Sequence, residues 1–250
     1  MTVTLILNWK MHPASEKEAK LLFTATKALA DKRKDLHLIV APPSVFLANL
    51  RRGYTGKKVF FASQSGRAEM TGAHTGSVSL SQLSNAGARY AIIGHAERRA
   101  EGETNEDTRA QVSSAYTLGM IPVLCVGERE RSPDNTHLTY VREQLRIGFA
   151  DIPQTKISSM IIAYEPVWAI GATHSMEARQ MHEMAVFIRK TLNELYGPRA
   201  MNASVLYGGS IDEHSAADMI ALGDVRGLLV GRASVDVSKL TALIESIPHK

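Results

Sequence analysis

Short apolar runs alternate with amphipathic stretches along the whole chain, and this alternation constrains the fold more than any other feature. Several runs are apolar at nearly every position, such as Leu38-Ile39-Val40. Continuous apolar runs of this length are typical of parallel strands that are covered on both faces. We expect strands at Val3–Trp9, Leu36–Ala41, Val59–Ala62, Tyr90–Ile93, Ile121–Val126, Met160–Tyr164, Ser204–Tyr207 and Gly227–Val230.

The stretches between these runs have the period of helices that cover a sheet with one face. Spacings of three and four produce apolar stripes at Ala19, Leu22, Phe23, Thr26, Leu29 and Ala30, at Leu138, Val141, Leu145 and Phe149, and at Met181, Met184, Ala185, Ile188, Leu192 and Leu195. Helix-ending residues follow at Gly87, Gly119, Gly197-Pro198 and Gly223. The pattern therefore predicts that each strand is followed by a helix.

Eight such units in 250 residues, with no Ser-, Pro- or Gly-rich linker, predict an α/β fold of one domain. We expect residues 1–250 to form a single (β/α)₈ barrel, also called a TIM barrel. An open doubly wound sheet is the alternative. That fold carries a Gly-x-Gly-x-x-Gly turn after its first strand, whereas this chain has Asn8-Trp9-Lys10 there.

Composition excludes several classes of protein. The chain has one cysteine, Cys125, which cannot form an internal disulfide, so we expect a cytoplasmic location. No apolar stretch approaches the roughly 18 residues of a membrane span. The net charge is +4 and the basic runs, such as Lys32-Arg33-Lys34, are short. We therefore expect no nucleic-acid or membrane partner, although a mildly positive protein suits a small anionic substrate.

Titratable and polar residues gather at the carboxyl ends of the expected strands. In a barrel these ends carry the functional side chains. The residues found there are Asn8, Lys10, Gln64, His95, Glu97, Cys125, Glu128, Glu165, Tyr207, Gly208, Gly209, Ser210, Gly231 and Arg232. Packing does not require so many charged groups directly after apolar strands. Cys125 alone we interpret as a buried, inert thiol.

Three of these side chains together can move a proton. Glu165 precedes Pro166-Val167-Trp168, and partial desolvation under an apolar loop would raise its basicity. His95 can donate to a substrate oxygen, and the Lys10 ammonium can stabilise a developing enolate or a phosphate. Each residue has a structural alternative, which is a salt bridge for Glu165, a core position for His95 and a surface position for Lys10.

Two glycine-bearing turns suit a phosphate group. Tyr207-Gly208-Gly209-Ser210 and Gly231-Arg232-Ala233-Ser234 follow the last two expected strands, where barrel enzymes commonly bind phosphate. Glycine lets backbone N–H groups approach an anion, although two ordinary tight turns would share this sequence. No His or Cys spacing typical of zinc occurs, so we expect no metal and no cofactor. Together these features predict proton transfer next to a carbonyl of a small phosphorylated substrate.

Five motifs in register resemble the triosephosphate isomerase family over essentially the whole chain. They are Asn8-Trp9-Lys10-Met11, Gly94-His95-Ala96-Glu97-Arg98-Arg99, Cys125-Val126-Gly127-Glu128, Ala163-Tyr164-Glu165-Pro166-Val167-Trp168-Ala169-Ile170-Gly171 and Tyr207-Gly208-Gly209-Ser210. The resemblance implies a glycolytic and gluconeogenic isomerase that interconverts dihydroxyacetone phosphate and glyceraldehyde 3-phosphate through an enediolate. An isomerase of a longer ketose phosphate, such as a tetrulose phosphate, is the alternative.

The resemblance also implies a role for each site residue. Glu165 would be the base, neutral His95 the electrophile and Lys10 the compensating cation. Asn8 would help position the substrate, and Glu97 would orient Lys10. Phosphate would meet four backbone N–H groups, those of Gly171, Ser210, Gly231 and Arg232.

A lid and a homodimer are implied as well. Residues 166–176 would close over the substrate, with Trp168 as an apolar anchor and with Tyr207 and Ser210 holding the closed form. In the family, the loop that corresponds to residues 64–79 enters the neighbouring subunit near Lys10. Thr75 would be the residue that reaches the partner's site.

Some positions depart from the family pattern. Ala96 stands where the family usually has Ser, which removes a hydroxyl near Glu165. Ser77 replaces a common Glu that would pair with Arg98, and we expect Glu103 to take over that pairing. The lid residues Ala172 to Met176 lack the usual second Gly, and the next helix, from Glu177, lacks a side-chain cap. We expect these changes to affect lid motion and dimer strength more than the chemistry.

Overall fold

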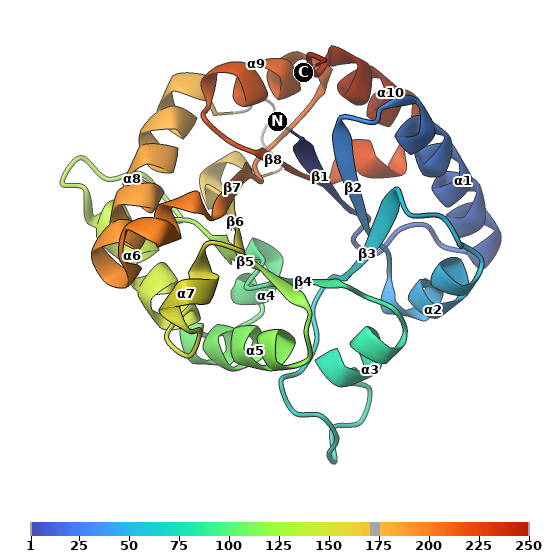
Figure 1. Ribbon diagram of the computed structural model, residues 1–250, viewed down its shortest axis with the longest axis horizontal. Coiled ribbons are helices and arrows are strands. Elements are labelled where there is room, and N and C mark those ends of the chain that lie inside the picture. The colour runs from blue at the N-terminus through green and yellow to red at the C-terminus, as the bar shows by residue number, and fades with distance from the viewer. Residues whose placement is uncertain (1, 171–175, 250) are drawn as a thin grey trace.

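Eight parallel strands, each followed by at least one helix, close into a barrel (Figure 1). This computed structural model describes residues 2–170 and 176–249. Each strand pairs with the next in sequence, and β8 returns to pair with β1. The predicted (β/α)₈ barrel is confirmed, and the doubly wound alternative is wrong. Among the described residues, no helix has both the length and the apolar character that a membrane span requires.

The strands follow the expected ranges closely. They are β1 (Val3–Asn8), β2 (Leu36–Ala41), β3 (Val59–Ser63), β4 (Tyr90–Ile93), β5 (Ile121–Val126), β6 (Ile161–Tyr164), β7 (Ser204–Tyr207) and β8 (Gly227–Val230). Only β1, β3 and β6 differ from the prediction, each by one residue at one end. The shortest ladder joins β7 to β8 through a single register pair, Tyr207 with Leu228.

The α-helices form a ring outside the barrel, except that α4 lies within this ring in the view shown (Figure 1). They are α1 (Glu16–Lys32), α2 (Ser44–Arg52), α3 (Leu80–Asn85), α4 (Ala96–Ala100), α5 (Asn105–Thr117), α6 (Thr136–Gly148), α7 (Gln154–Ile157), α8 (Ala178–Tyr196), α9 (Glu213–Leu222) and α10 (Val237–Ser246). Short 3₁₀ helices are η1 (Val167–Ala169), η2 (Pro198–Asn202) and η3 (Arg232–Val235). All six residues of the stripe predicted in α1 are buried, since they face the sheet.

Two layers of core lie on the two faces of the strands. In β1, Ile6 points into the barrel, whereas Leu5 and Leu7 pack under the helices. Every strand contributes to the interior cluster, which consists of Ile6, Ile39, Ala41, Ala62, Tyr90, Ile92, Val123, Cys125, Ile161, Ala163, Leu206 and Leu229. Apolar side chains on both faces explain why the strands read as continuous apolar runs. The filled interior leaves the carboxyl ends of the strands as the place for a site.

Candidate active site

A cavity of about 290 Å³ lies at the carboxyl ends of the strands. Ten of the predicted site residues line it, namely Asn8, Lys10, His95, Glu97, Glu165, Gly208, Gly209, Ser210, Gly231 and Arg232. Tyr207, Trp168 and Thr75 do not line it. Gly171 and the predicted lid residues up to Ser175 lie outside the described residues. The structure thus brings together most of a site that the sequence scatters over more than 200 positions.

Lys10 occupies a strained turn after β1. Its backbone has a positive φ of 53°, which is uncommon for a residue other than glycine. The turn is held from both sides, because Lys10 N donates to Asn8 Oδ1 at 3.1 Å and Gln64 Nε2 donates to Lys10 O at 2.8 Å. The Lys10 ammonium then pairs with Glu97 Oε1. This direct contact supports the expectation that Glu97 orients Lys10.

The contact with Lys10 favours the charged form of Glu97. Burial raises the pKa of the Glu97 carboxyl, but the hydrogen bond and the charge of Lys10 outweigh burial and hold the pKa below its usual value. Glu97 is therefore a carboxylate at neutral pH. It fixes the ammonium at the edge of the cavity.

His95 caps the helix that follows β4. Its Nδ1 accepts a hydrogen bond from Glu97 N, two residues on in α4, at 3.2 Å. Because Nδ1 is used as an acceptor, the hydrogen of a neutral ring belongs on Nε2. His95 is 7% exposed, and its Nε2 lies 3.4 Å from Glu165 Oε1. The fold thus aims an N–H donor at the carboxylate and the cavity.

Glu165 follows β6 and is 2% exposed. Ala96 N donates to Glu165 Oε2 at 3.0 Å, so the carboxylate keeps a backbone donor although the family's Ser hydroxyl is absent. Within the described part of the chain, Glu165 Oε1 is buried and receives no hydrogen bond. A buried carboxylate oxygen with an open lone pair beside an N–H donor is arranged to accept a proton.

The glycines after β7 leave room for Glu165 and Tyr207. A Cβ on Gly208 would lie 2.8 Å from Glu165 Cγ, and one on Gly209 would lie 2.2 Å from Tyr207 Oη. That Tyr207 oxygen accepts a hydrogen bond from Met176 N at 3.1 Å. Burial raises the pKa of Tyr207 to about 12. Tyr207 therefore holds the start of the segment that leads into α8 as a neutral phenol.

The turns after β7 and β8 contact each other. Arg232 Nη2 donates to Ser210 Oγ at 3.2 Å. Ser234 Oγ lies within hydrogen-bonding distance of Gly231 O and Asn8 O, which ties the β8 turn to the end of β1. Ser210 N donates to Ala169 O at 3.1 Å. In this structure the Ser210 N–H is therefore directed at the loop after β6.

Trp168 lies outside the cavity, beside the buried carboxylate of Glu128. Its side chain is 39% exposed, and its Nε1 donates to Glu128 Oε1 at 2.9 Å. Glu128 is 2% exposed and also accepts from Tyr164 Oη at 2.8 and 3.0 Å. Trp168 is thus held by a hydrogen bond to a buried carboxylate. A partly buried indole N–H usually finds such a partner.

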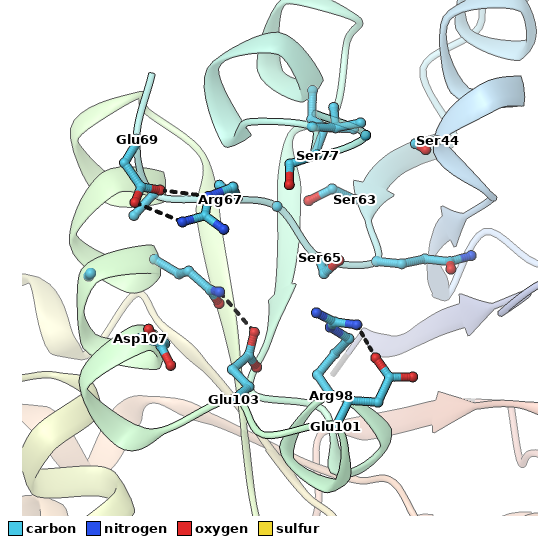
Figure 2. Close-up of a pocket in the computed structure, with 18 of the residues that line it drawn as sticks. Ser44, Ser63, Ser65, Arg67, Glu69, Ser77, Arg98, Glu101, Glu103 and Asp107 are labelled. Carbon is cyan, nitrogen blue, oxygen red and sulfur yellow. Dashed lines mark hydrogen bonds and ion pairs between the residues drawn. The ribbon is translucent and has the colours of Figure 1, made fainter. Parts of the chain in front are cut away.

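The predicted pairing of Arg98 with Glu103 is wrong. Arg98 pairs with Glu101, one helical turn along the chain, whereas Glu103 accepts from Gln111 Nε2 at 2.8 Å (Figure 2). A neighbour in the same turn costs less side-chain ordering than a distant one. The predicted absence of a side-chain cap at Glu177 is confirmed.

Sequence reasoning missed three contributors near the site. They are Tyr164, which has the sequence character of an ordinary strand residue, Glu128, whose position after a strand indicates no particular role, and Arg131. A carboxylate directly after an apolar strand was the available signal for Glu128. Arg131 gave no signal, because its position in a polar segment looks like ordinary surface.

Cys125 lies in the barrel interior and is free. Burial, and next the Glu165 carboxylate, raise the pKa of the Cys125 thiol well above its usual value. A buried protonated thiol is inert. Among residues 2–170 and 176–249, no group of three or more His, Cys, Asp or Glu side chains is placed to hold a metal ion.

Comparisons with known proteins agree with the geometry. The family model described as triosephosphate isomerase matches residues 3–247. The chain is 37% identical to the triosephosphate isomerase of Moorella thermoacetica over 240 residues, which cover 95% of each chain. It is 34% identical to that of Hydrogenovibrio crunogenus over 96% of this chain and 95% of the relative. It is 35% identical to that of Porphyromonas gingivalis over 96% of both. The barrel, the cavity at its strand ends and these matches place the chain in the triosephosphate isomerase family.

Proposed function

We propose that this chain interconverts dihydroxyacetone phosphate and glyceraldehyde 3-phosphate, with Glu165, His95 and Lys10 as catalytic residues. One observation carries these roles. The open lone pair of Glu165 Oε1, the Nε2 side of His95 and the Lys10 ammonium all face one small cavity. A base, an oxygen donor and a cation are what enolisation of a phosphorylated carbonyl compound requires.

The proton moves between two carbons through Glu165. The carboxylate removes a proton from the carbon next to the carbonyl, and the bond electrons form the enediolate. His95 Nε2–H donates to the carbonyl oxygen, where negative charge develops, and Lys10 offsets that charge. Glu165 then returns the proton to the neighbouring carbon, while the proton of the substrate hydroxyl passes through His95 to the former carbonyl oxygen, so no net proton is consumed and no cofactor is needed.

The phosphate of the substrate is held by the turns after β7 and β8. The backbone N–H groups of Ser210, Gly231 and Arg232 supply donors, and Gly171 would add one from outside the described residues. Ser210 N–H donates to Ala169 O in this structure, so its use for phosphate requires η1 to shift. Closure of residues 166–176 would accomplish this shift and exclude water.

Isomerisation of glyceraldehyde 3-phosphate by the purified chain tests the proposal, with Glu165→Gln as the blank. Turnover that the blank lacks supports both the reaction and the base. Glu165→Asp withdraws the carboxylate by one methylene, about 1 Å, so kcat should fall by roughly 10²- to 10³-fold. Absent turnover on three-carbon substrates together with turnover on a tetrulose phosphate would favour the longer-substrate alternative, which no comparison supports.

The chain forms a homodimer through the loop between β3 and α3. This loop, residues 64–79, projects from the rim of the barrel (Figure 1). A second cavity of about 590 Å³ lies at its base and is lined by Ser63, Ser65, Ser77 and Arg98 among others (Figure 2). The buried Ser63 Oγ has no hydrogen-bond partner within the described residues, and an inserted loop would supply one.

Exposed apolar side chains support the same interface. Met11 is 91% exposed, and Val45, next to the cavity-lining Ser44, is 75% exposed. Gln64 lines the cavity and bonds Lys10 O, so a partner seated there would buttress the Lys10 turn. Thr75 is exposed on the loop and would reach the partner's site.

Sedimentation equilibrium tests the dimer. Thr75→Arg should shift the chain toward monomer and lower kcat, whereas Thr24→Arg, on the exposed face of α1, should do neither. A wild-type chain that sediments as a monomer at every concentration would refute the dimer. We further propose that residues 1–250 form one domain and that the protein is cytoplasmic, which the unpaired Cys125 supports.

A further inference from the structure

A buried carboxylate outside the cavity ties down both sides of the catalytic base. Glu128 accepts hydrogen bonds from Tyr164 Oη, just before Glu165, and from Trp168 Nε1, just after it. The backbone joins in, because Val167 N donates to Glu128 O at 2.9 Å. Glu128 therefore fixes the chain on either side of Glu165, although neither Glu128 nor its two aromatic partners line the cavity.

Arg131 completes this cluster. Its Nε lies 3.8 Å from Glu128 Oε1, and its guanidinium carbon lies 5.8 Å from the centre of the Trp168 ring. In the described part of the chain, it is the one cationic side chain within 4.0 Å of the Glu128 carboxylate. Burying a carboxylate costs free energy unless a cation compensates for it. A guanidinium over an indole face is attracted as well.

The contact of Arg131 with Glu128 and Trp168 involves no hydrogen bond from Nε or Nη2, which affects how η1 can move. Arg131 Nε and Nη2 are buried and have no hydrogen-bond partner within the described residues. Arg131 thus holds Glu128 by charge and Trp168 by the attraction of a cation to the indole face. These forces change gradually with distance, whereas a hydrogen bond weakens steeply when it is bent. Such a contact can restrain η1 and still let it move.

We propose that Arg131 is a positioning residue for the isomerase reaction, which holds Trp168 against Glu128 and so sets the start of the loop that follows Glu165. This inference rests on the proposed function. Arg131 does not line the cavity, so it acts through Glu128 and Trp168 and not on the substrate. Weakening this hold leaves the enediolate less well enclosed, and an exposed enediolate expels its phosphate by cleavage of the carbon–oxygen bond.

Three variants test the proposal. Arg131→Met keeps the length of the side chain and removes its charge and planar head. Arg131→Lys keeps the charge beside Glu128 but cannot stack as a plane. Arg129→Met is the matched control, since Arg129 lies in the same segment, carries the same charge and is exposed.

Three measurements distinguish positioning from a general loss of structure. Acrylamide quenching of tryptophan fluorescence reports on Trp168, because the other tryptophan, Trp9, is fully buried. We expect Arg131→Met to increase quenching and to lower kcat/KM by about tenfold, equivalent to about 1.4 kcal/mol. We expect it to raise the inorganic phosphate released per isomerisation. Arg131→Lys should recover part of each change, and Arg129→Met should match the wild type.

Two results would overturn the proposal. One is wild-type quenching, kinetics and phosphate release in Arg131→Met. The other is a loss of activity with unchanged quenching and phosphate release, because activity would then be lost without any loosening of Trp168. If Arg131→Met does not fold, the same comparison is made with Arg131→Lys. An inactive wild type would refute the proposed function, while the quenching comparison would still show whether Arg131 holds Trp168.

Discussion

Adding one methyl group at Gly208 should move the catalytic base without touching it chemically. A Cβ at this position would lie 2.8 Å from Glu165 Cγ and 3.4 Å from Oε1. Ordinary contact begins at 3.4 Å, so the first distance is about 0.6 Å too short. Glu165 is almost completely buried and its Cγ cannot swing into solvent, so the carboxylate itself must shift.

The size of the effect follows from that displacement. A misplacement of about 1 Å costs about 10²-fold in rate, so a shift of about 0.6 Å should lower kcat by roughly 15-fold, equivalent to about 1.6 kcal/mol. The KM should change less, since the backbone donors for phosphate remain. Steady-state kinetics of Gly208→Ala measure both, and a thermal melt checks that the variant is folded.

Gly53→Ala is the matched control. A Cβ there meets nothing closer than 3.5 Å, and the residue, at the end of α2, does not line the cavity. It should leave kcat unchanged. A Gly208→Ala enzyme with wild-type kcat would refute the reasoning, because either the turn after β7 does not hold Glu165 or Glu165 is not the base.

Three further predictions concern stability. Tyr207→Phe leaves the buried Met176 N–H without its acceptor, which should cost about 1–3 kcal/mol and lower the Tm by several degrees in calorimetry; an unchanged Tm would contradict this. The Arg33 guanidinium holds the pKa of Asp35 well below its usual value, so the pair stabilises the fold above about pH 4 and this contribution is lost as the pH falls. Denaturant titrations from pH 5 downward should therefore show a smaller loss of unfolding free energy for Asp35→Asn than for the wild type. Equal losses in the two proteins would exclude this contribution of the Arg33–Asp35 pair to stability. A phosphate-bearing substrate analogue at 100 times its Kd should add about 2.7 kcal/mol to the free energy of unfolding, and no shift in Tm would count against the anion site.

The fold could be predicted because its signals are local. Apolar runs covered on both faces and stripes such as Ala19, Leu22 and Phe23 follow from burial alone. Predicted and observed element ends differ by one residue where side chains such as Trp9 stay buried beyond the last residue of the strand. Burial and strand pairing are different properties, and an apolar pattern reports only the first.

The contacts within the site were harder to predict, because they depend on distances between segments. Nothing in the sequence distinguishes Glu101 from Glu103 as the partner of Arg98. The Lys10 turn, with its positive φ, is held by hydrogen bonds with Asn8 and Gln64, and Gln64 follows a different strand, β3. Motif spacing located the residues, whereas their pairing required the three-dimensional structure.

Closure of the barrel has a consequence for aggregation. Every strand from β1 to β8 has a neighbour on both sides, so the native sheet offers no free edge on which another chain could add a strand. An edge would arise only if a seam opened, and the seam between β7 and β8 has the shortest ladder. The turns proposed to bind phosphate follow these two strands. A substrate bridging them would therefore hold the seam closed and protect the protein from intermolecular strand pairing.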